Sequence, residues 1–388
     1  MHLLIIGVIF LTFIGLGSAD ALFGSAWPTI QTEMGVPLSY AGIVSMTITI
    51  GAITASLLSA RLLKKFGAGL VATGGIMLSS FTLLGFSFSD SFWMLCTLAF
   101  PLGLAGGTID AALNNYVAHN YTSKHMNWLH CFWGLGAVIS PSIMGFALTI
   151  GAGWNSGYRI AFFIQLVIAL LLLASQPLWE KEKNSASTKQ SQPVALKLSE
   201  VFHIKGVKYL IIGFFSYVAL EATAGLWAST FLVKERGFDT EIAAGFAALF
   251  FIGITLGRFV SGFISEKIGD KNMVRVGISI VFIGIFSIWL PADSNFFVLG
   301  GLIITGLGCA PIFPAIIHST PKNFGKEQSQ SIIGVQLASA YTGAALMPPL
   351  FGLIANYISV GSYPIFLLIM ATLMIFATEK LNQTVAKK

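Results

Sequence analysis

The stretches ADALFG (residues 19–24) and LEATAG (residues 220–225) decide the fold. Each lies in a long apolar segment, and each contains a carboxylate, Asp20 in the first and Glu221 in the second. The two acids are 201 positions apart, as are Gly24 and Gly225. A charged side chain at the centre of a bilayer costs about 2.5–3.5 kcal/mol on insertion scales. Two equivalent positions of this kind indicate an internal repeat and a function for both acids.

The composition is that of a membrane protein. Of the 388 residues, 55% are hydrophobic and only 10% are charged, whereas a soluble domain carries about 25% charged residues. So few charges cannot cover a soluble surface. Cys96, Cys131 and Cys309 lie in apolar runs and have the spacing of neither a metal site nor a disulfide framework. We therefore expect a polytopic membrane protein with no metal and no cofactor beyond a coupling ion.

Apolar runs of about 20 residues can each cross a bilayer as a helix. The sequence predicts twelve, at residues 4–30, 38–62, 70–89, 91–118, 126–149, 157–178, 208–233, 241–265, 273–291, 295–319, 329–356 and 360–379. We expect the first to be retained, because it is too long for the apolar core of a signal peptide. The polar segment EKEKNSASTKQSQPVALKLSE is typical of a disordered linker. It divides the chain into a six-helix bundle (1–179), a cytoplasmic linker (180–205) and a second six-helix bundle (206–388).

Lys and Arg set the orientation, because cytoplasmic loops carry an excess of them. If both termini are cytoplasmic, all but four of the 22 Lys and Arg residues lie on the cytoplasmic side. Arg159, Lys234 and Arg236 lie in outer loops, and Arg258 lies within a span. The net charge of +6 reflects this bias, so no nucleic-acid partner is expected. We predict a monomeric multi-pass protein of the cell (inner) membrane, with the lipid bilayer and a small-molecule substrate as its partners.

The two halves align further along the chain. Equivalent positions pair Gly51 with Gly253, Gly136 with Gly343 and Pro141 with Pro348, at offsets of 202 to 207. Six spans return the chain to the side where it began, so the repeat is parallel, about an axis along the membrane normal. The sequence therefore predicts an all-α membrane protein of two six-helix bundles related by a parallel pseudo-two-fold.

This organisation resembles the major facilitator superfamily, whose two halves form such a repeat. SARLLKKFGAG (residues 59–69) and its echo GRFVSGFISEKIGDK (residues 257–271) resemble its cytoplasmic loop signature, although the first lacks the acidic position. The resemblance implies a charged latch between helix ends, for which we expect Arg61, Lys65, Arg258 and Glu266. A solvated basic loop is the alternative interpretation.

Polar residues deep in the spans are the candidate site. Ionisable residues in a membrane usually face a pathway, and helical spacing places polar, small and aromatic residues on shared faces. For proton coupling we expect Asp20, Asp110, Glu221 and His130. For substrate binding we expect Asp20, Trp27, Asp110, Asn114, Asn127, His130, Trp133, Glu221, Trp227, Gln336 and Tyr341. Carboxylates and amides can bind sugar hydroxyls, and rings can cover the apolar face of a sugar. The alternative is a structural role, as protonated acids and a packed histidine.

Three stretches of the sequence resemble one particular family within this superfamily. GLAGGTIDAALNNYVA (103–118), NWLHCFWGLGAVISP (127–141) and GLGCAPIFPAI (306–316) resemble helices 4, 5 and 10 of the fucose:proton symporter family. That resemblance implies that Asp20 and Asp110 serve coupling and sugar recognition. It also implies a helix broken at Pro311 and Pro314 beside the cavity. The family has a substrate-binding amide where this chain has His130, so the resemblance does not identify the sugar.

We therefore expect proton-coupled symport of a sugar or similar small polar solute by alternating access. Burial disfavours the charged form of a carboxyl, so such a group can take up and release a proton. The alternative is a proton-antiport exporter of drugs or amphiphiles. Exporters tend to carry G-P-x-x-G-G in helix 5, and here Ser140 precedes Pro141. A non-transporting sensor and sodium coupling also remain open. No nucleophile–base pair or phosphate loop indicates an enzyme.

Overall fold

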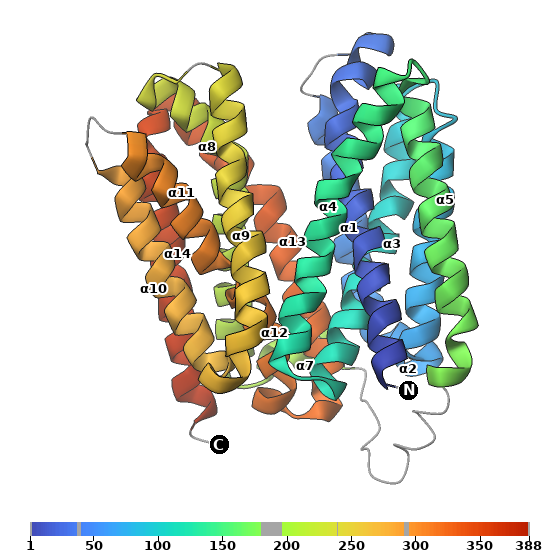
Figure 1. Ribbon diagram of the computed structural model, residues 1–388. Helices are drawn as coiled ribbons and strands as arrows, with labels where there is room; N and C mark the ends of the chain where they lie inside the picture. Colours follow the sequence, from blue (N-terminus) through green and yellow to red (C-terminus); the bar gives the residue numbers. More distant parts are fainter. Residues whose placement is uncertain (1, 37–39, 180–195, 239, 291–294, 387–388) are drawn as a thin grey trace. The chain divides into compact units, whose positions relative to one another are not determined.

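The computed structural model describes residues 2–36, 40–179, 196–238, 240–290 and 295–386, nearly all of them helical (Figure 1). Most of the predicted linker, 180–195, lies outside the described residues. The helices are α1 His2–Glu33, α2 Ala41–Phe86, α3 Phe92–Asn120, α4 Ser123–Thr149, α5 Gly153–Ala174, α7 Leu198–His203, α8 Val207–Arg236, α9 Thr240–Ile268, α10 Asp270–Trp289, α11 Asn295–Cys309, α12 Ile312–Phe324, α13 Lys326–Tyr357, the 3₁₀ turn η2 Val360–Ser362 and α14 Tyr363–Val385.

Eleven helical stretches among the described residues are long and apolar enough to cross a membrane. The remaining predicted crossing lies within α2, whose 46 residues contain one non-helical residue, Gly67, at φ 79° and ψ 164°. Glycine adopts this conformation readily because it has no Cβ. Gly67 lies between the predicted spans 38–62 and 70–89, so α2 supplies two crossings joined by a single-residue break.

The predicted tenth span is also divided. α11 ends at Cys309 and α12 begins at Ile312, with Pro311 at the N-cap. Proline favours a break in a helix because it lacks an N–H and its ring clashes with the preceding turn. Pro314 lies in the first turn of α12, where backbone N–H groups have no helical partner in any case. The break predicted at Pro311 is confirmed, and Pro314 belongs to the helix that follows it.

The chain forms two compact units. The first comprises residues 1–116, 129–196 and 326–334. Within it, α1 and α4 cross where each presents a glycine, because a Cβ on Gly17 would overlap the carbonyl oxygen of Trp133 and one on Gly136 would overlap that of Ile14. Small residues let helix backbones approach closely in membranes. The α1–α4 crossing therefore depends on two residues without side chains.

The second unit comprises residues 117–128, 197–325 and 335–388, and it repeats these contacts. A Cβ on Gly343 of α13 would press on the carbonyl of Phe215 of α8, and Phe215 stands 201 positions after Ile14. Likewise, Gly253 of α9 abuts the carbonyl of Ile303 of α11, as its counterpart in α2 abuts α3. The predicted repeat is therefore confirmed by equivalent backbone contacts inside each unit.

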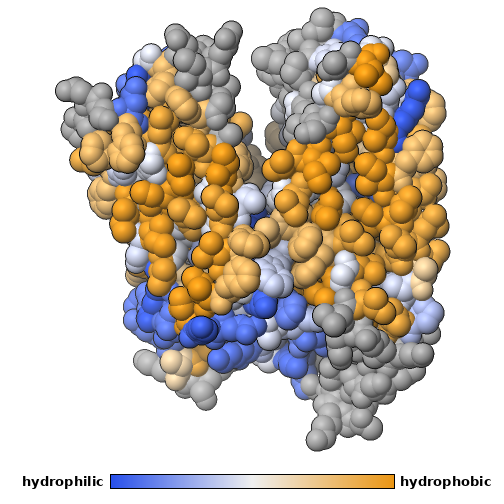
Figure 2. Space-filling model, viewed as in Figure 1, coloured by the Kyte–Doolittle hydropathy of each residue, from blue (hydrophilic) through white to orange (hydrophobic). Residues whose placement is uncertain are grey.

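Apolar side chains cover the outward faces of the helices in both units (Figure 2). Phe163 and Val167 on α5 and Phe259 and Phe263 on α9 are each more than 50% exposed. An apolar surface of this extent suits contact with lipid chains rather than water. Hydrophilic residues gather at the end of the second unit where α9 meets α10 (Figure 2). The surface is that of a multi-pass membrane protein.

Candidate substrate and proton site

Three of the predicted residues form a hydrogen-bonded chain in the first unit. The amide nitrogen of Asn114 donates to the Asp110 carboxylate at 2.7 Å and to the Asp110 main-chain oxygen at 2.9 Å. Nε2 of His130, on α4, lies 3.0 Å from the amide oxygen of Asn114. All three side chains are buried, at 8% exposure or less. The chain links a carboxylate on α3 to an imidazole on α4.

The chemistry of these groups fixes the direction of the hydrogen bonds. An ionised carboxylate only accepts, so Asp110 holds the Asn114 amide with its NH₂ group toward the acid. The amide oxygen then faces His130, whose Nε2 must carry a proton in order to donate. The ring of Phe13 meets the His130 ring edge-on at 5.6 Å between centroids. The carboxylate and the main-chain oxygen of Asp110 together hold the Asn114 amide with its oxygen toward His130.

Asp20 and Trp133 form a second contact in the same unit. The indole Nε1 of Trp133 on α4 donates to the Asp20 carboxylate at 2.9 Å. Asp20 is exposed, so it is accessible on this unit. Gly17 brings α1 close to α4 near this contact, and the hydroxyl of Ser140 donates to the Ser18 carbonyl at 2.7 Å. The α1–α4 crossing thus positions the carboxylate against the indole.

Of the two other predicted residues on α1 and α4, Asn127 lies apart from this chain. The side chain of Trp27 lies outside the described side chains. Asn127 is 1% exposed and donates to the Ser123 carbonyl at 2.8 Å. Asn127 belongs to the second unit, because residues 117–128, at the turn between α3 and α4, pack with α9, α10 and α12. We call residues 117–128 the α3–α4 corner.

In the second unit, the predicted acid has a cationic partner. Arg258 on α9 lies 3.3 Å from the Glu221 carboxylate on α8, with side-chain exposures of 5% and 20%. The sequence suggested Arg258 as a partner of Glu266, and the structure places it against Glu221 instead. A buried arginine needs a counter-charge because desolvating an unpaired charge is costly. Arg258 lies ten residues before the α9 C-terminus, so it cannot reach that end of the helix while it neutralises Glu221.

Three further predicted residues belong to the core of the second unit or its margin. The indole of Trp227 donates to the Pro348 carbonyl at 3.0 Å and packs edge-on against Phe351, so it faces α13. Gln336 is fully buried and accepts from the Thr320 hydroxyl at 3.0 Å. Tyr341 is half-buried on α13. Trp227 and Gln336 therefore make helix–helix contacts in this unit.

Three of the four predicted latch residues lie on the surface, whereas Arg258 is buried. Arg61 and Lys65 are exposed on α2, and the Lys65 ammonium lies 5.1 Å from the Phe66 ring centroid. Glu266, at the end of α9, accepts a hydrogen bond from the Thr122 hydroxyl at 2.5 Å. Of the four, Glu266 is therefore the one that the structure ties to another helix end, through the α3–α4 corner.

The sequence did not predict a second hydrogen-bond network at the α3–α4 corner. Asp270, the first residue of α10, accepts from the Ser123 hydroxyl and lies 2.7 Å from Nδ1 of His318 on α12. Nε2 of the same ring lies 3.1 Å from the Tyr121 carbonyl oxygen. A carboxylate and a carbonyl can only accept, so both ring nitrogens carry protons and His318 is an imidazolium. An Asp beginning a helix after the Gly269 break was the sequence signal available.

The comparisons with known proteins agree with this architecture. The sequence pattern of the Major Facilitator Superfamily matches residues 8–295 and, in a second match, residues 246–381. Bypass of stop codon protein 6 of Saccharomyces cerevisiae is 23% identical, covering 93% of this chain and 79% of that protein. The glucose/mannose transporter GlcP of Bacillus subtilis is 21% identical over 78% of this chain and 76% of its own length. The class B tetracycline resistance protein of Escherichia coli is 25% identical, covering 73% of this chain and 68% of that protein.

Solved structures share the fold. The crystal structure of FucP, a Major Facilitator Superfamily transporter in the outward conformation, superposes with a TM-score of 0.79 at 14% identity, covering 96% of this chain and 97% of that one. A second structure, of the E. coli fucose:proton symporter FucP, gives 0.75 at 16% identity, covering 97% and 98%. The superfamily fold has twelve helices in two bundles, as the repeat predicted. The chain belongs to the Major Facilitator Superfamily of membrane transporters.

Proposed function

We propose that this transporter is a proton-coupled symporter of a sugar or similar small polar solute, working by alternating access in the cell membrane with both termini cytoplasmic. The buried chain Asp110–Asn114–His130 is the observation that carries the proposal. It joins a carboxyl that can take up a proton to an imidazole that can bind a hydroxyl. The likeness to FucP and the relationship to a glucose/mannose transporter support the same substrate class.

The coupling step follows from the hydrogen-bond inventory. While Asp110 is ionised, it holds the amide of Asn114 in one orientation. Protonation removes the negative charge of this carboxyl and so weakens the 2.7 Å bond, while the main-chain oxygen of Asp110 still accepts from the same amide at 2.9 Å. The amide oxygen therefore stays toward His130, and the link between Asn114 and the carboxyl loosens. Proton uptake thereby loosens the chain that positions the His130 imidazole for a substrate hydroxyl.

Asp20 and Trp133 provide a surface that is complementary to a sugar. An exposed carboxylate accepts from sugar hydroxyls, and an indole ring covers the apolar face of a sugar. The 2.9 Å bond fixes the indole edge toward Asp20, and this orients the ring plane before substrate arrives. Preorganised groups of this kind raise affinity because less freedom is lost on binding.

The test is uptake by proteoliposomes with an imposed pH gradient, using a panel of radiolabelled sugars and an internal pH dye. Wild-type protein should accumulate one class of sugar above its external concentration and acidify the lumen. Asp110→Asn should retain exchange of that sugar and lose accumulation, because the amide cannot take up the proton. Accumulation by Asp110→Asn equal to that of wild type would remove the proposed role of this carboxyl.

The second candidate is proton-antiport export of drugs or amphiphiles, favoured by the relationship to the tetracycline resistance protein. The helix-5 position where exporters tend to carry glycine holds Ser140, and its hydroxyl bonds α4 to α1. That departure from the exporter pattern therefore has a structural use here. Reversing the pH gradient in the same vesicles separates the two: a symporter accumulates solute when the outside is acidic, and an antiporter when the inside is.

A further inference from the structure

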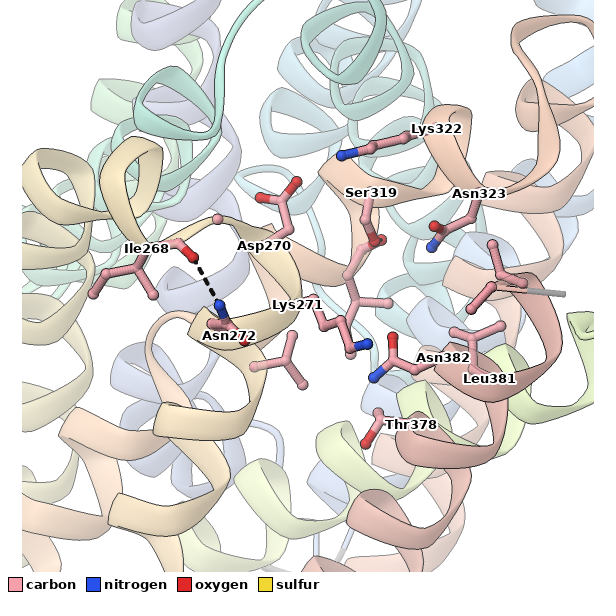
Figure 3. A pocket seen from close by; sticks show the side chains of 15 residues that line it. Ile268, Asp270, Lys271, Asn272, Ser319, Lys322, Asn323, Thr378, Leu381 and Asn382 are labelled. Atoms are coloured by element: carbon pink, nitrogen blue, oxygen red, sulfur yellow. Dashed lines mark hydrogen bonds between the residues drawn. The ribbon is translucent and has the colours of Figure 1, made fainter. Parts of the chain in front are cut away.

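A pocket of about 310 Å³ lies in the second unit between the start of α10, the end of α12 and the end of α14 (Figure 3). Its size is at the lower end of the roughly 300–1,000 Å³ of ligand-binding pockets. Lys271 and Lys322 contribute ammonium groups, and Asn323 and Asn382 contribute amides. In Figure 3, Lys271 and Asn382 point toward one another, with Asn323 on the neighbouring α12. The polar lining is therefore rich in hydrogen-bond donors.

The acids beside this pocket already have partners. Asp270 lines the pocket, and its two carboxylate oxygens are engaged by Ser123 and by the His318 imidazolium. Glu379, next to the pocket on α14, is held at two points by Arg275, at 2.7 and 2.6 Å. The negative charges of both acids are thus compensated locally. Neither lysine has an ion-pair partner among the described residues.

The backbone at the start of α10 adds further positive charge to this pocket. α10 begins at the pocket edge, directly after Gly269 at φ 79°, and the first N–H groups of a helix have no helical acceptors. A helix N-terminus carries about half a positive charge. Together with the two lysines, neither of which forms a salt bridge in the part of the chain that the structure describes, it favours an anion with several acceptor oxygens.

The remaining wall of the pocket is apolar. Its apolar lining residues include Val274, Ile316, Leu381 and Val385. A free inorganic anion would leave these side chains uncovered, whereas an esterified phosphate carries a hydrocarbon group that can cover them. The pocket lies at the membrane end that the distribution of lysine and arginine predicts to be cytoplasmic.

We propose that this pocket binds a phosphate ester anion, with Lys271 and Lys322 on the phosphate and the apolar wall against its organic group. Two sources share that chemistry: the headgroup of an anionic phospholipid in the adjacent leaflet, and a soluble phosphate ester. Basic pockets between membrane helices at the cytoplasmic side suit phospholipid headgroups. The site is separate from the Asp110 chain, and the proposal does not depend on the coupling mechanism.

Native mass spectrometry of the full-length, delipidated protein tests the proposal. Its probes are dioleoylphosphatidylglycerol, the zwitterionic dioleoylphosphatidylcholine, glycerol phosphate and inorganic phosphate. The pocket variant is Lys271→Gln/Lys322→Gln. The matched control, Lys267→Gln/Lys380→Gln, removes the same charge outside the pocket at the same end of the unit. Elution from size exclusion checks that both are folded, and the single variant Lys322→Gln replaces the pocket variant if that fails.

We expect the dissociation constant for phosphatidylglycerol to rise about thirty-fold in the pocket variant, since each lysine near anionic lipid contributes about 1 kcal/mol, which is a factor of about five. The control should change less than about threefold. Binding of glycerol phosphate with the same lysine dependence, without binding of phosphatidylglycerol, would assign the site to a soluble ester. Equal losses in both double variants, or no binding of any ester probe by the wild type, would overturn the proposal.

Discussion

Gly17 lies about one helical turn before Asp20 on α1. Adding a methyl group at Gly17 should therefore disturb the contact between Asp20 and Trp133. A Cβ at this position would lie 2.9 Å from the carbonyl carbon of Trp133 and 3.1 Å from the nitrogen of Ala137, and would overlap the Trp133 oxygen. Ordinary contacts begin near 3.4 Å, so α1 and α4 must separate by at least about 0.5 Å. The 2.9 Å bond between Trp133 and Asp20 would then exceed the roughly 3.2 Å limit of a good hydrogen bond.

The expected cost of Gly17→Ala is about 1–3 kcal/mol, the range for overpacked cores, with a loss of substrate affinity because the indole is no longer held. The control is Gly7→Ala on the same helix, where a Cβ would meet nothing within 4 Å. That change should leave stability the same or raise it by up to about 1 kcal/mol. Thermal unfolding in detergent and equilibrium sugar binding measure both effects. Equal stability and equal affinity of the two variants would refute the reasoning about the α1–α4 crossing.

Three other changes probe the remaining networks. Asn114→Leu keeps the branched shape of the side chain but removes the hydrogen bonds to Asp110 and His130, so stability should fall by about 1–3 kcal/mol and accumulation should be lost. Unchanged accumulation in vesicles would exclude a coupling role for the Asp110–Asn114–His130 chain. Arg258→Leu leaves Glu221 without its buried cation and should lower the free energy of unfolding by about 3 kcal/mol. Adding Glu221→Gln should restore most of this loss. If thermal unfolding shows no recovery in the double variant, the pairing is contradicted. His318 donates through both ring nitrogens only when it is protonated. Raising the pH from about 6 to about 9 should therefore destabilise the wild type more than His318→Gln. If the melting temperatures of the two proteins change in parallel with pH, His318 is not an imidazolium.

Much of the architecture followed from the sequence because lipid imposes strong constraints on it. Apolar runs must be helices, since no water is present to bond the backbone, and equivalent glycines recur where helices must touch. Gly51 and Gly253 were aligned by sequence, and both lie against backbone carbonyls of a neighbouring helix. Gly67 was not foreseen as a break within one continuous helix, because a glycine in a basic loop and a glycine at positive φ look alike in a sequence.

Part of the candidate site also followed from helical spacing. Asp110 and Asn114 stand four residues apart, and their side chains bond on one face of α3. Contacts between helices could not be derived in this way, because they depend on the rotation of one helix against another. The pairing of Arg258 with Glu221 is such a contact, and so is the meeting of Asp270 with His318. A pattern of spacing gives the face of a residue but not its partner.

The repeat explains why the acids of the two halves need not share one task. Asp20 and Glu221 occupy equivalent positions, but Glu221 is neutralised by Arg258. The offset of 202 between helices 2 and 8 places Arg258 over Ser56 of the first half, which carries no charge. Asp20 accepts from the neutral indole of Trp133 instead. The charge of Glu221 is thus balanced by a neighbouring cation, whereas the hydrogen bond to Asp20 comes from a neutral donor. The equivalent positions thus carry a partly buried ion pair in the second unit and an exposed carboxylate bonded to an indole in the first.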